Sequence, residues 1–197
     1  MNPTEAEIVA RLHAAQERPH TDGYAEREES APKRAAVLVP LLRHDGEWHL
    51  LFTRRTDKVE SHKNQVSFPG GACDEGETTP EQTALREANE EIGLDPNQVR
   101  VLGQLNSMLT ITSFLVTPVV GVIPWPAVFR PAQAEVARIF TMPLTWLAER
   151  SNRWEFNLLG RAHSVIVYHP FDGEILWGAT ARMSVDFLEM LFPDRSE

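Results

Sequence analysis

The pattern of apolar and polar positions divides the chain into helices and strands. Residues 4–17 carry three apolar side chains at helical spacing among polar ones, which predicts a short amphipathic helix. Apolar runs at 35–42 and 48–55 flank Asp45-Gly46, a strong signal for a tight turn. We therefore expect a β-hairpin over these two runs.

Further apolar runs follow the hairpin. They predict strands at residues 99–105, 114–124, 164–170 and 174–178. A last amphipathic helix is expected over residues 179–192. Pro40 cannot donate a hydrogen bond to a β-ladder, which places it at an edge or a bulge. Strands mixed with a few well-separated helices favour an α/β or α+β sandwich over a helical bundle.

The helix before residue 94 has the clearest boundaries. Thr79 is a candidate N-cap, Pro80 suits the first helical position, and Gln82 completes a capping box with Thr79. Gly93 is the expected C-terminal stop. This helix is therefore predicted more sharply than any other element.

The same helix carries a stripe of three glutamates, Glu87, Glu90 and Glu91, at i, i+3, i+4 spacing. Their carboxylates share one face, beside an apolar face that can pack on a sheet. Acidic runs on helices are usually solvated surfaces, and the stripe alone favours that interpretation. Hard divalent cations such as Mg²⁺ take oxygen ligands, so the stripe also suits a metal site.

The surroundings of the stripe shift the balance toward a metal site. Five basic residues precede the helix, namely Arg54, Arg55, Lys58, His62 and Lys63. The tight turn at Pro69-Gly70-Gly71 would let backbone carbonyls approach a metal closely. An acidic helix for cations beside a basic connection for anions is what a metal–polyphosphate site needs. Arg86 lies at the flank, where it can orient the carboxylates.

Composition limits the class of protein. The 197 residues suit one domain, and the formal net charge of −9 argues against general nucleic-acid binding. No apolar run is long enough to span a bilayer, and the N-terminus does not resemble a secretory signal. Cys73 is the single cysteine, which fits a reducing compartment. We therefore expect a cytoplasmic protein without a membrane or nucleic-acid partner.

Residues 71–94, GACDEGETTPEQTALREANEEIGL, resemble the Nudix box. That pattern runs Gly, five residues, Glu, seven residues, then Arg-Glu-apolar-x-Glu-Glu-x-Gly-apolar. Its slots are filled here by Gly71, Glu77, Arg86, Glu87, Ala88, Glu90, Glu91, Gly93 and Leu94. The spacing from Glu77 to Arg86 is one residue longer than in the pattern, near the Thr79-Pro80 cap.

The resemblance implies a fold and a set of roles. The fold would be a Nudix-type α/β/α sandwich with a mixed β-sheet, over residues 34–192, after an N-terminal helix and polar arm at 1–33. The activity would be hydrolysis of a diphosphate linked to another moiety, with Mg²⁺ or Mn²⁺. The metal ligands would be Glu87, Glu90, Glu91 and the carbonyl of Gly71, with Arg86 orienting the glutamates.

A second resemblance concerns the substrate. Residues 51–71, LFTRRTDKVESHKNQVSFPGG, are similar to the signature that precedes the box in the coenzyme A pyrophosphatase branch. The matching residues are Thr53, Arg55, Val66, Phe68, Pro69, Gly70 and Gly71. The departures are Phe52, Thr56, Glu60 and Asn64, which replace Leu, Ser, Arg and Gly. The longer box spacing is itself similar to this branch.

Several assignments stay open at the level of sequence. The general base is Glu135 or Glu90, and we favour Glu135 although it also fits an ordinary surface glutamate before a strand. Arg55, His62 and Lys63 would grip substrate phosphates, or they balance nearby acids. Alternative substrates are ADP-ribose and dinucleoside polyphosphates, and a further alternative is a non-catalytic nucleotide-sensing module. A homodimer, and whether the N-terminal helix packs on its own domain or on a second chain, are left open.

Overall fold

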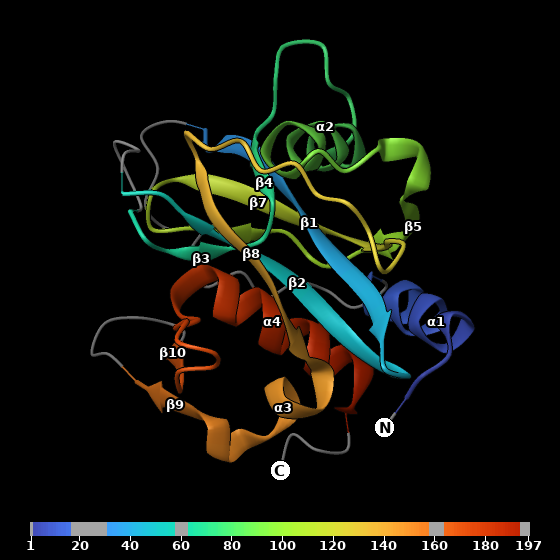
Figure 1. Ribbon diagram of the computed structural model, residues 1–197, viewed down its shortest axis with the longest axis vertical. Helices are drawn as coiled ribbons and strands as arrows, with labels where there is room; N and C mark the ends of the chain where they lie inside the picture. Colours follow the sequence, from blue (N-terminus) through green and yellow to red (C-terminus); the bar gives the residue numbers. More distant parts are fainter. Residues whose placement is uncertain (1, 17–30, 58–62, 158–163, 194–197) are drawn as a thin grey trace.

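A mixed β-sheet forms the middle layer of the molecule. The structure is a computed structural model that describes residues 2–16, 31–57, 63–157 and 164–193. Helix α2 (Pro80–Ile92) packs on one face of the sheet, and helix α4 (Gly178–Leu191) packs on the other (Figure 1). Two separate clusters of buried apolar side chains fill the two interfaces. This arrangement confirms the predicted α/β/α sandwich with a mixed sheet.

Strand order follows from the pairing of the long strands. The strands of the sheet are β1 (Lys33–His44), β2 (Glu47–Arg55), β3 (Val66–Ser67), β4 (Gly70–Ala72), β5 (Arg100–Gln104), β6 (Met108–Leu109), β7 (Phe114–Val122) and β8 (Val136–Pro143). The main path runs β3-β2-β1-β7-β5, with β4 on β1, β6 on β7 and β8 on β2. The β1–β7 pair is parallel and the other pairs are antiparallel, which makes the sheet mixed.

The predicted hairpin is present. β1 and β2 pair antiparallel, with His44 opposite Glu47, and the turn residues Asp45 and Gly46 have φ of 49° and 80°. Two successive positive φ values are what a two-residue turn needs to match the twist of its strands. The Asp-Gly pair therefore set this turn locally.

Pro40 lies inside the sheet, opposite Gly121 of β7. Leu38 donates its N–H to Pro69 O on the β4 side. Residue 40 is two positions further along the strand, so a backbone N–H at this position would point to the same side. On that side β4 pairs only with residues 35–37 of β1, and β2 pairs only from residue 41. Pro40 therefore falls between two partner strands, where its missing N–H leaves no ladder bond unmade.

Helix α2 begins and ends where the sequence predicts. The side chain of Thr79 accepts a hydrogen bond from Gln82 N, and Gln82 Oε1 accepts one from Thr79 N at 3.2 Å. Gly93 ends the helix with φ of 68°. Ala88 and Ile92 are fully buried against the sheet. Because that face is fixed by burial, the glutamate stripe is held at the margin of the core.

Most of the remaining elements lie on the opposite side of the sheet. They are α1 (Glu5–Gln16), α3 (Leu144–Ala148), β9 (Arg153–Phe156), β10 (Val165–Tyr168) and α4, with a short 3₁₀ turn at Arg150–Asn152. A second 3₁₀ turn, Pro96–Gln98, follows α2 and lies beside it. The strand expected at 174–178 is wrong. Only isolated bridges form there, Phe171 with Glu174 and Val167 with Trp177, because α4 already begins at Gly178. Within the described residues, no helix is long and apolar enough to cross a membrane.

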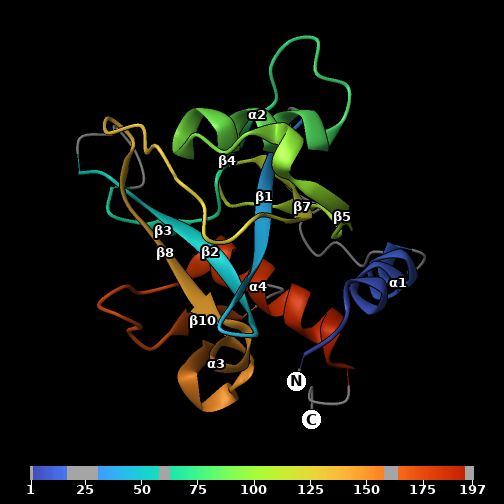
Figure 2. The same ribbon diagram turned by 45° about the vertical axis from the view of Figure 1, so that its right-hand side comes forward.

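Helix α1 packs on its own chain, which answers the question that the sequence left open. Ile8 and Leu12 are fully buried in the cluster that also contains Leu102 and Leu191. Arg11 donates to the carbonyl of Leu191 at the end of α4. Figure 2 shows α1 beside β5 and the end of α4. The helix thus closes one end of the apolar core.

We expect Leu12→Ala to destabilise the whole domain. The side chain is fully buried, so truncation removes apolar burial and leaves a cavity, at a cost of about 3 kcal/mol. Urea unfolding followed by tryptophan fluorescence measures the change, with exposed His13→Ala as the control. Equal stability of the Leu12 and His13 variants would show that α1 contributes no packing energy.

Candidate metal and phosphate site on helix α2

Segments distant in the sequence meet at one end of the sheet. Arg55, the last residue of β2, has Nη1 3.6 Å from Glu91 Oε1 of α2 and Nη2 3.9 Å from Glu135 Oε2 in the loop before β8. Gly71 of β4 faces Glu87, since a Cβ at Gly71 would lie 2.3 Å from Glu87 Oε1. The fold thus brings together five residues that the sequence singled out.

Arg86 donates hydrogen bonds to several acidic side chains of the site. Its Nη1 donates to Glu87 Oε1 and to Glu90 Oε2, each at 2.9 Å. Its Nε donates to Glu77 Oε1 at 2.8 Å, and its Nη2 donates to Ala72 O at 3.0 Å. The guanidinium therefore ties two carboxylates of α2 to the turn before the helix and to β4.

Glu77 is a site residue that was not among the predicted metal ligands or catalytic groups. It accepts hydrogen bonds from Thr83 Oγ1 at 2.6 Å and from Asp74 N at 2.8 Å, in addition to Arg86. The hydrogen bond from Arg86 is the main cause that lowers the pKa of Glu77 to about 2. The extra residue before Arg86 therefore does not separate the two side chains. The sequence feature that could have identified Glu77 as a site residue is its position in the pattern of residues 71–94.

The three stripe glutamates have different environments. The side chain of Glu90 is 57% exposed, whereas those of Glu87 and Glu91 are 17% and 5% exposed. Burial raises the pKa of Glu87, against the opposing effect of Arg86. Burial also raises the pKa of Glu91 to about 7, against the lowering effect of Arg55. The stripe therefore runs from solvent into the core, which periodicity alone did not reveal.

The donor set fits a divalent cation. Glu91 Oε2 is buried and has no hydrogen-bond partner within the part of the chain that the structure describes, which is costly unless a cation or a donor binds there. The carboxylate of Glu87 can lie against β4 only because residue 71 lacks a Cβ. Carboxylate oxygens are the ligands that Mg²⁺ and Mn²⁺ prefer, and Mg²⁺ keeps several waters, so one or two carboxylates suffice.

The carboxylates are not gathered into a cage. In the part of the chain that the structure describes, no three His, Cys, Asp or Glu side chains converge in a geometry that would hold a metal. Arg86 provides the reason, because its Nη1 already binds Glu87 and Glu90. The exposed Glu90 side chain would have to turn away from Arg86 to join a metal shell.

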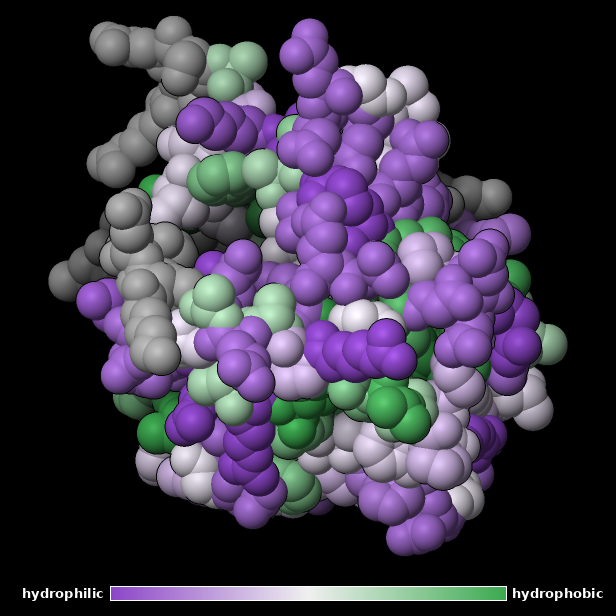
Figure 3. All heavy atoms as spheres, turned by 45° about the horizontal axis from the view of Figure 1, so that its top comes forward, coloured by the Kyte–Doolittle hydropathy of each residue, from purple (hydrophilic) through white to green (hydrophobic). Residues whose placement is uncertain are grey.

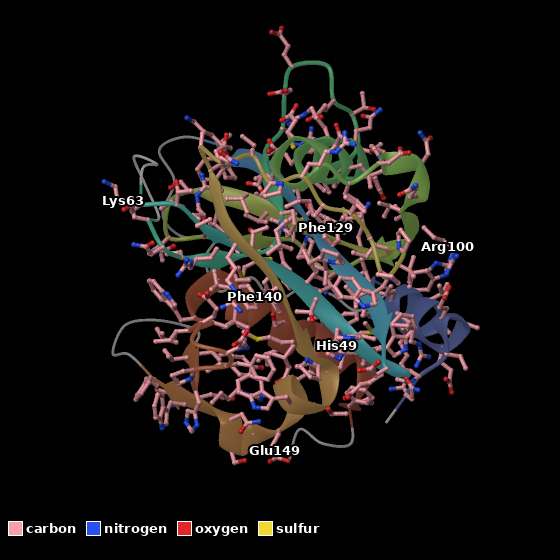
Figure 4. The ribbon with its side chains drawn as sticks, in the orientation of Figure 1. His49, Lys63, Arg100, Phe129, Phe140 and Glu149 are labelled. Carbon is pink, nitrogen blue, oxygen red and sulfur yellow. The ribbon has the colours of Figure 1, made fainter. Side chains whose placement is uncertain are left out.

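Two of the predicted phosphate-binding residues, Arg55 and Lys63, are described by the structure, and they lie apart. Arg55 lies among the carboxylates of the site. Lys63 is exposed and points outward from the connection between β2 and β3 (Figure 4). His62 lies outside the described residues. Figure 3 shows hydrophilic side chains gathered over α2 and the loop before it. Of the two described residues, Arg55 alone lies beside the glutamates.

We expect Glu91→Gln to stabilise the metal-free protein above neutral pH. Burial raises the pKa of Glu91 to about 7 in the folded chain, whereas an unfolded glutamate has a pKa of about 4.3. Between these values the folded state binds more protons, so the free energy of unfolding falls as the pH rises. At pH 8 the free energy of unfolding is lower by about 4 kcal/mol for this reason, and glutamine avoids that loss.

Urea unfolding of both proteins with a chelator, at pH 5 and pH 8, measures this difference. At pH 5 the gain in stability from glutamine should be about a third of the gain at pH 8. The reason is that pH 5 lies less than about one unit above the pKa of the unfolded carboxyl, so most of the interval between the two pKa values has not yet been crossed. The same gain at both pH values would contradict the expectation.

Comparison with known proteins adds the family context. The model of the NUDIX domain matches residues 32–158. The protein named Uncharacterized Nudix hydrolase NudL from Escherichia coli O6:H1 is 38% identical over 151 residues, which cover 77% of this chain and 73% of that protein. The protein of the same name from Pectobacterium atrosepticum is 39% identical over 150 residues, which cover 76% and 78%.

Solved structures agree with the fold. A Nudix hydrolase from M. smegmatis, RenU, superposes with a TM-score of 0.51 at 25% identity, over 60% of this chain and 75% of that one. A MutT/nudix family protein from Enterococcus faecalis superposes with a TM-score of 0.55 at 15% identity, over 98% and 70%. The second likeness bears on the fold alone.

Proposed function

The chain belongs to the Nudix hydrolase family, and on this premise we propose that it cleaves the diphosphate linkage of coenzyme A or its derivatives. The products would be 3′,5′-ADP and 4′-phosphopantetheine. Nudix hydrolases act on nucleoside diphosphate derivatives and generally use divalent metal ions. The finer assignments, which are coenzyme A, Mg²⁺ or Mn²⁺, and the individual site residues, are our proposal.

The conformation of Asn64 is the observation that carries the choice of substrate. The coenzyme A signature has glycine at this position, and Asn64 has φ of 58°, in the left-handed region. Asparagine is one of the few other residues that adopts this region readily. The replacement therefore keeps the backbone conformation that glycine would provide in the loop between β2 and β3.

Phe52 supports the same assignment. It replaces leucine of the signature, is fully buried, and stacks on Phe68 with ring centroids 4.9 Å apart. Phe68 is itself a signature residue, directly before the Pro-Gly-Gly turn. The larger side chain is thus absorbed by packing inside the core. Glu60, the other departure of note, lies outside the described residues.

The proposed mechanism divides the work between the metal and the protein. When bound, a divalent metal would supply charge neutralisation on the diphosphate and activation of the attacking water. Glu87, Glu90 and Glu91, with the carbonyl of Gly71, would hold it, and Arg86 orients Glu87 and Glu90.

Proton transfer falls to a carboxylate outside the helix. Water oxygen attacks one phosphorus, the bond from that phosphorus to the bridging oxygen breaks, and the water proton passes to a general base. Glu135 suits this role because its side chain is half exposed while its backbone is fixed, with its carbonyl accepting from Thr56 N at 2.8 Å. Glu90 is the alternative base. Positioning and electrostatics supply most of the rate enhancement in such chemistry.

A substrate panel tests the proposal. Coenzyme A, ADP-ribose, NADH and diadenosine polyphosphates are each incubated with the protein and Mg²⁺ or Mn²⁺, and products are separated by chromatography. We expect the largest kcat/KM for coenzyme A, with 3′,5′-ADP and 4′-phosphopantetheine as products. A larger kcat/KM for another compound would assign the enzyme to that substrate instead. No cleavage of any of them would contradict the proposed function.

A further inference from the structure

Strand β2 ends in two consecutive arginines, Arg54 and Arg55, whose side chains lie on opposite faces of the sheet. Arg54 Nη1 lies 3.7 Å from the buried carboxylate of Glu174, on the side of α4. Arg55 lies on the side of α2, near Glu91 and Glu135. Successive strand residues point to opposite faces, so the chain separates the two charges by one position.

A β-bulge occurs at this point. Arg54 pairs with Arg138 of β8, but Arg55 pairs with Val136, so Ala137 is the extra residue. Bulges bend a strand and re-aim the side chains beside them. Directly after the bulge, Thr56 N donates to Glu135 O and Thr56 Oγ1 donates to Ala134 O, each at 2.8 Å. The loop that carries Glu135 is therefore fastened to the end of β2.

The contacts of Arg55 differ in kind from those of Arg86. Arg86 donates to Glu87 and Glu90 at hydrogen-bond distance, 2.9 Å. Arg55 lies 3.6 Å from Glu91 and 3.9 Å from Glu135, beyond hydrogen-bond distance. It therefore attracts both carboxylates and leaves their lone pairs available to other groups.

The two carboxylates that flank Arg55 come from separate elements. Glu91 belongs to α2 and is buried, and Glu135 belongs to the loop before β8 and is half exposed. Like charges repel, and a cation between them offsets that repulsion, more strongly where water is excluded. Arg55 is itself three-quarters buried, so its charge acts at short range on both.

We propose that Arg55 is a positioning residue and not a ligand of the substrate phosphates. It keeps the carboxylates of Glu91 and Glu135 in fixed positions relative to each other. This inference rests on the proposed function, because it assigns the partner residue through which the general base is aligned. It replaces the phosphate-binding role that the sequence pattern favours for Arg55. Glu135 then acts on the reacting water from a place that Arg55 sets.

Steady-state kinetics of Arg55→Met test the role. Methionine keeps an apolar stem of similar length and removes the charge. A misaligned base lowers kcat, by about 10²-fold for a displacement near 1 Å, while KM stays within about twofold. In the Glu135→Gln background the same change should cost less than about tenfold, because the base, which is one of the two groups that Arg55 positions, is already disabled. The kinetics use whichever compound of the panel is cleaved.

Two kinetic outcomes would overturn the proposal. A raised KM with unchanged kcat would make Arg55 a substrate ligand. Equal losses from Arg55→Met in the wild-type and Glu135→Gln backgrounds would show that the two residues act independently. Arg54→Met serves as the matched control, because it removes the neighbouring charge on the opposite face, and we expect it to leave kcat within about twofold.

Hydrogen exchange provides a readout that needs neither substrate nor metal. Glu135 N and Val136 N both donate to Ala132 O, at 2.8 Å, within the loop that Arg55 is proposed to hold. We expect these two amides to exchange faster in chelator-treated Arg55→Met and at the wild-type rate in Arg54→Met. Unchanged exchange in Arg55→Met would refute the positioning role, even if the substrate proves to be another nucleotide.

Discussion

Glu90→Gln and Glu91→Gln should each lose metal-dependent hydrolysis, by about 10³-fold in kcat. Glutamine has nearly the same shape as glutamate but lacks the charge that attracts a divalent cation. Glu91 brings a buried oxygen that has no hydrogen-bond partner among the described residues, and Glu90 brings an exposed carboxylate that accepts a hydrogen bond from Arg86. The measurement is the release of product from the preferred substrate at saturating Mg²⁺, then at saturating Mn²⁺.

The same set of variants includes a control substitution, and each variant is tested for correct folding. Glu75 is an exposed acid of the loop before α2, so Glu75→Gln changes the net charge equally and should keep full activity. Thermal unfolding verifies that each variant is folded. Glu91→Gln is expected to be more stable than the wild type at pH 8 without metal, so its loss of activity cannot arise from unfolding. Full activity in both the Glu90 and Glu91 variants would end the proposal of a metal site on α2.

Gly71→Ala should lower kcat by about 10²-fold while the protein stays folded. The added Cβ would lie 2.3 Å from Glu87 Oε1 and 2.8 Å from Oε2, so the carboxylate has to move by about 1 Å, which is enough to cost that factor. The clash involves the end of a flexible side chain, so the backbone need not shift. Activity at saturating metal and thermal unfolding are measured together.

Gly70→Ala is the matched contrast. Its Cβ would lie 2.5 Å from Ala36 O and 2.6 Å from Val37 Cα, which are backbone atoms of the central strand. This variant should lose stability by about 2 kcal/mol, as overpacked cores do, whereas Gly71→Ala should lose activity.

A double variant tests the cause of the Gly71 effect. In a Glu87→Asp background the carboxylate lies further from Gly71, so Gly71→Ala should cost less than it does alone. An equal cost in both backgrounds would show that the side chain of Glu87 is not what the new methyl group displaces.

Local signals account for the elements that the sequence predicted well. The capping box, Pro80 and Gly93 determine α2 through hydrogen bonds and φ values within a few residues. The same holds for the Asp45-Gly46 turn. The strand expected at 174–178 failed because an apolar run does not say where the following helix begins. Pattern and local backbone chemistry thus identified where α2 begins and ends, and failed where two elements compete for the same residues.

The sequence by itself determined which helix carries the acidic stripe, which family the chain resembles, and which face of α2 is apolar. Only the tertiary structure decided that Glu91 is buried while Glu90 is exposed, that Glu77 reaches Arg86 despite the longer spacing, and that Arg55 lies between two carboxylates. The physical reason is that burial and charge pairing depend on atoms far apart along the chain. Such contacts form when strands pair and layers pack, and no window of neighbouring residues contains them.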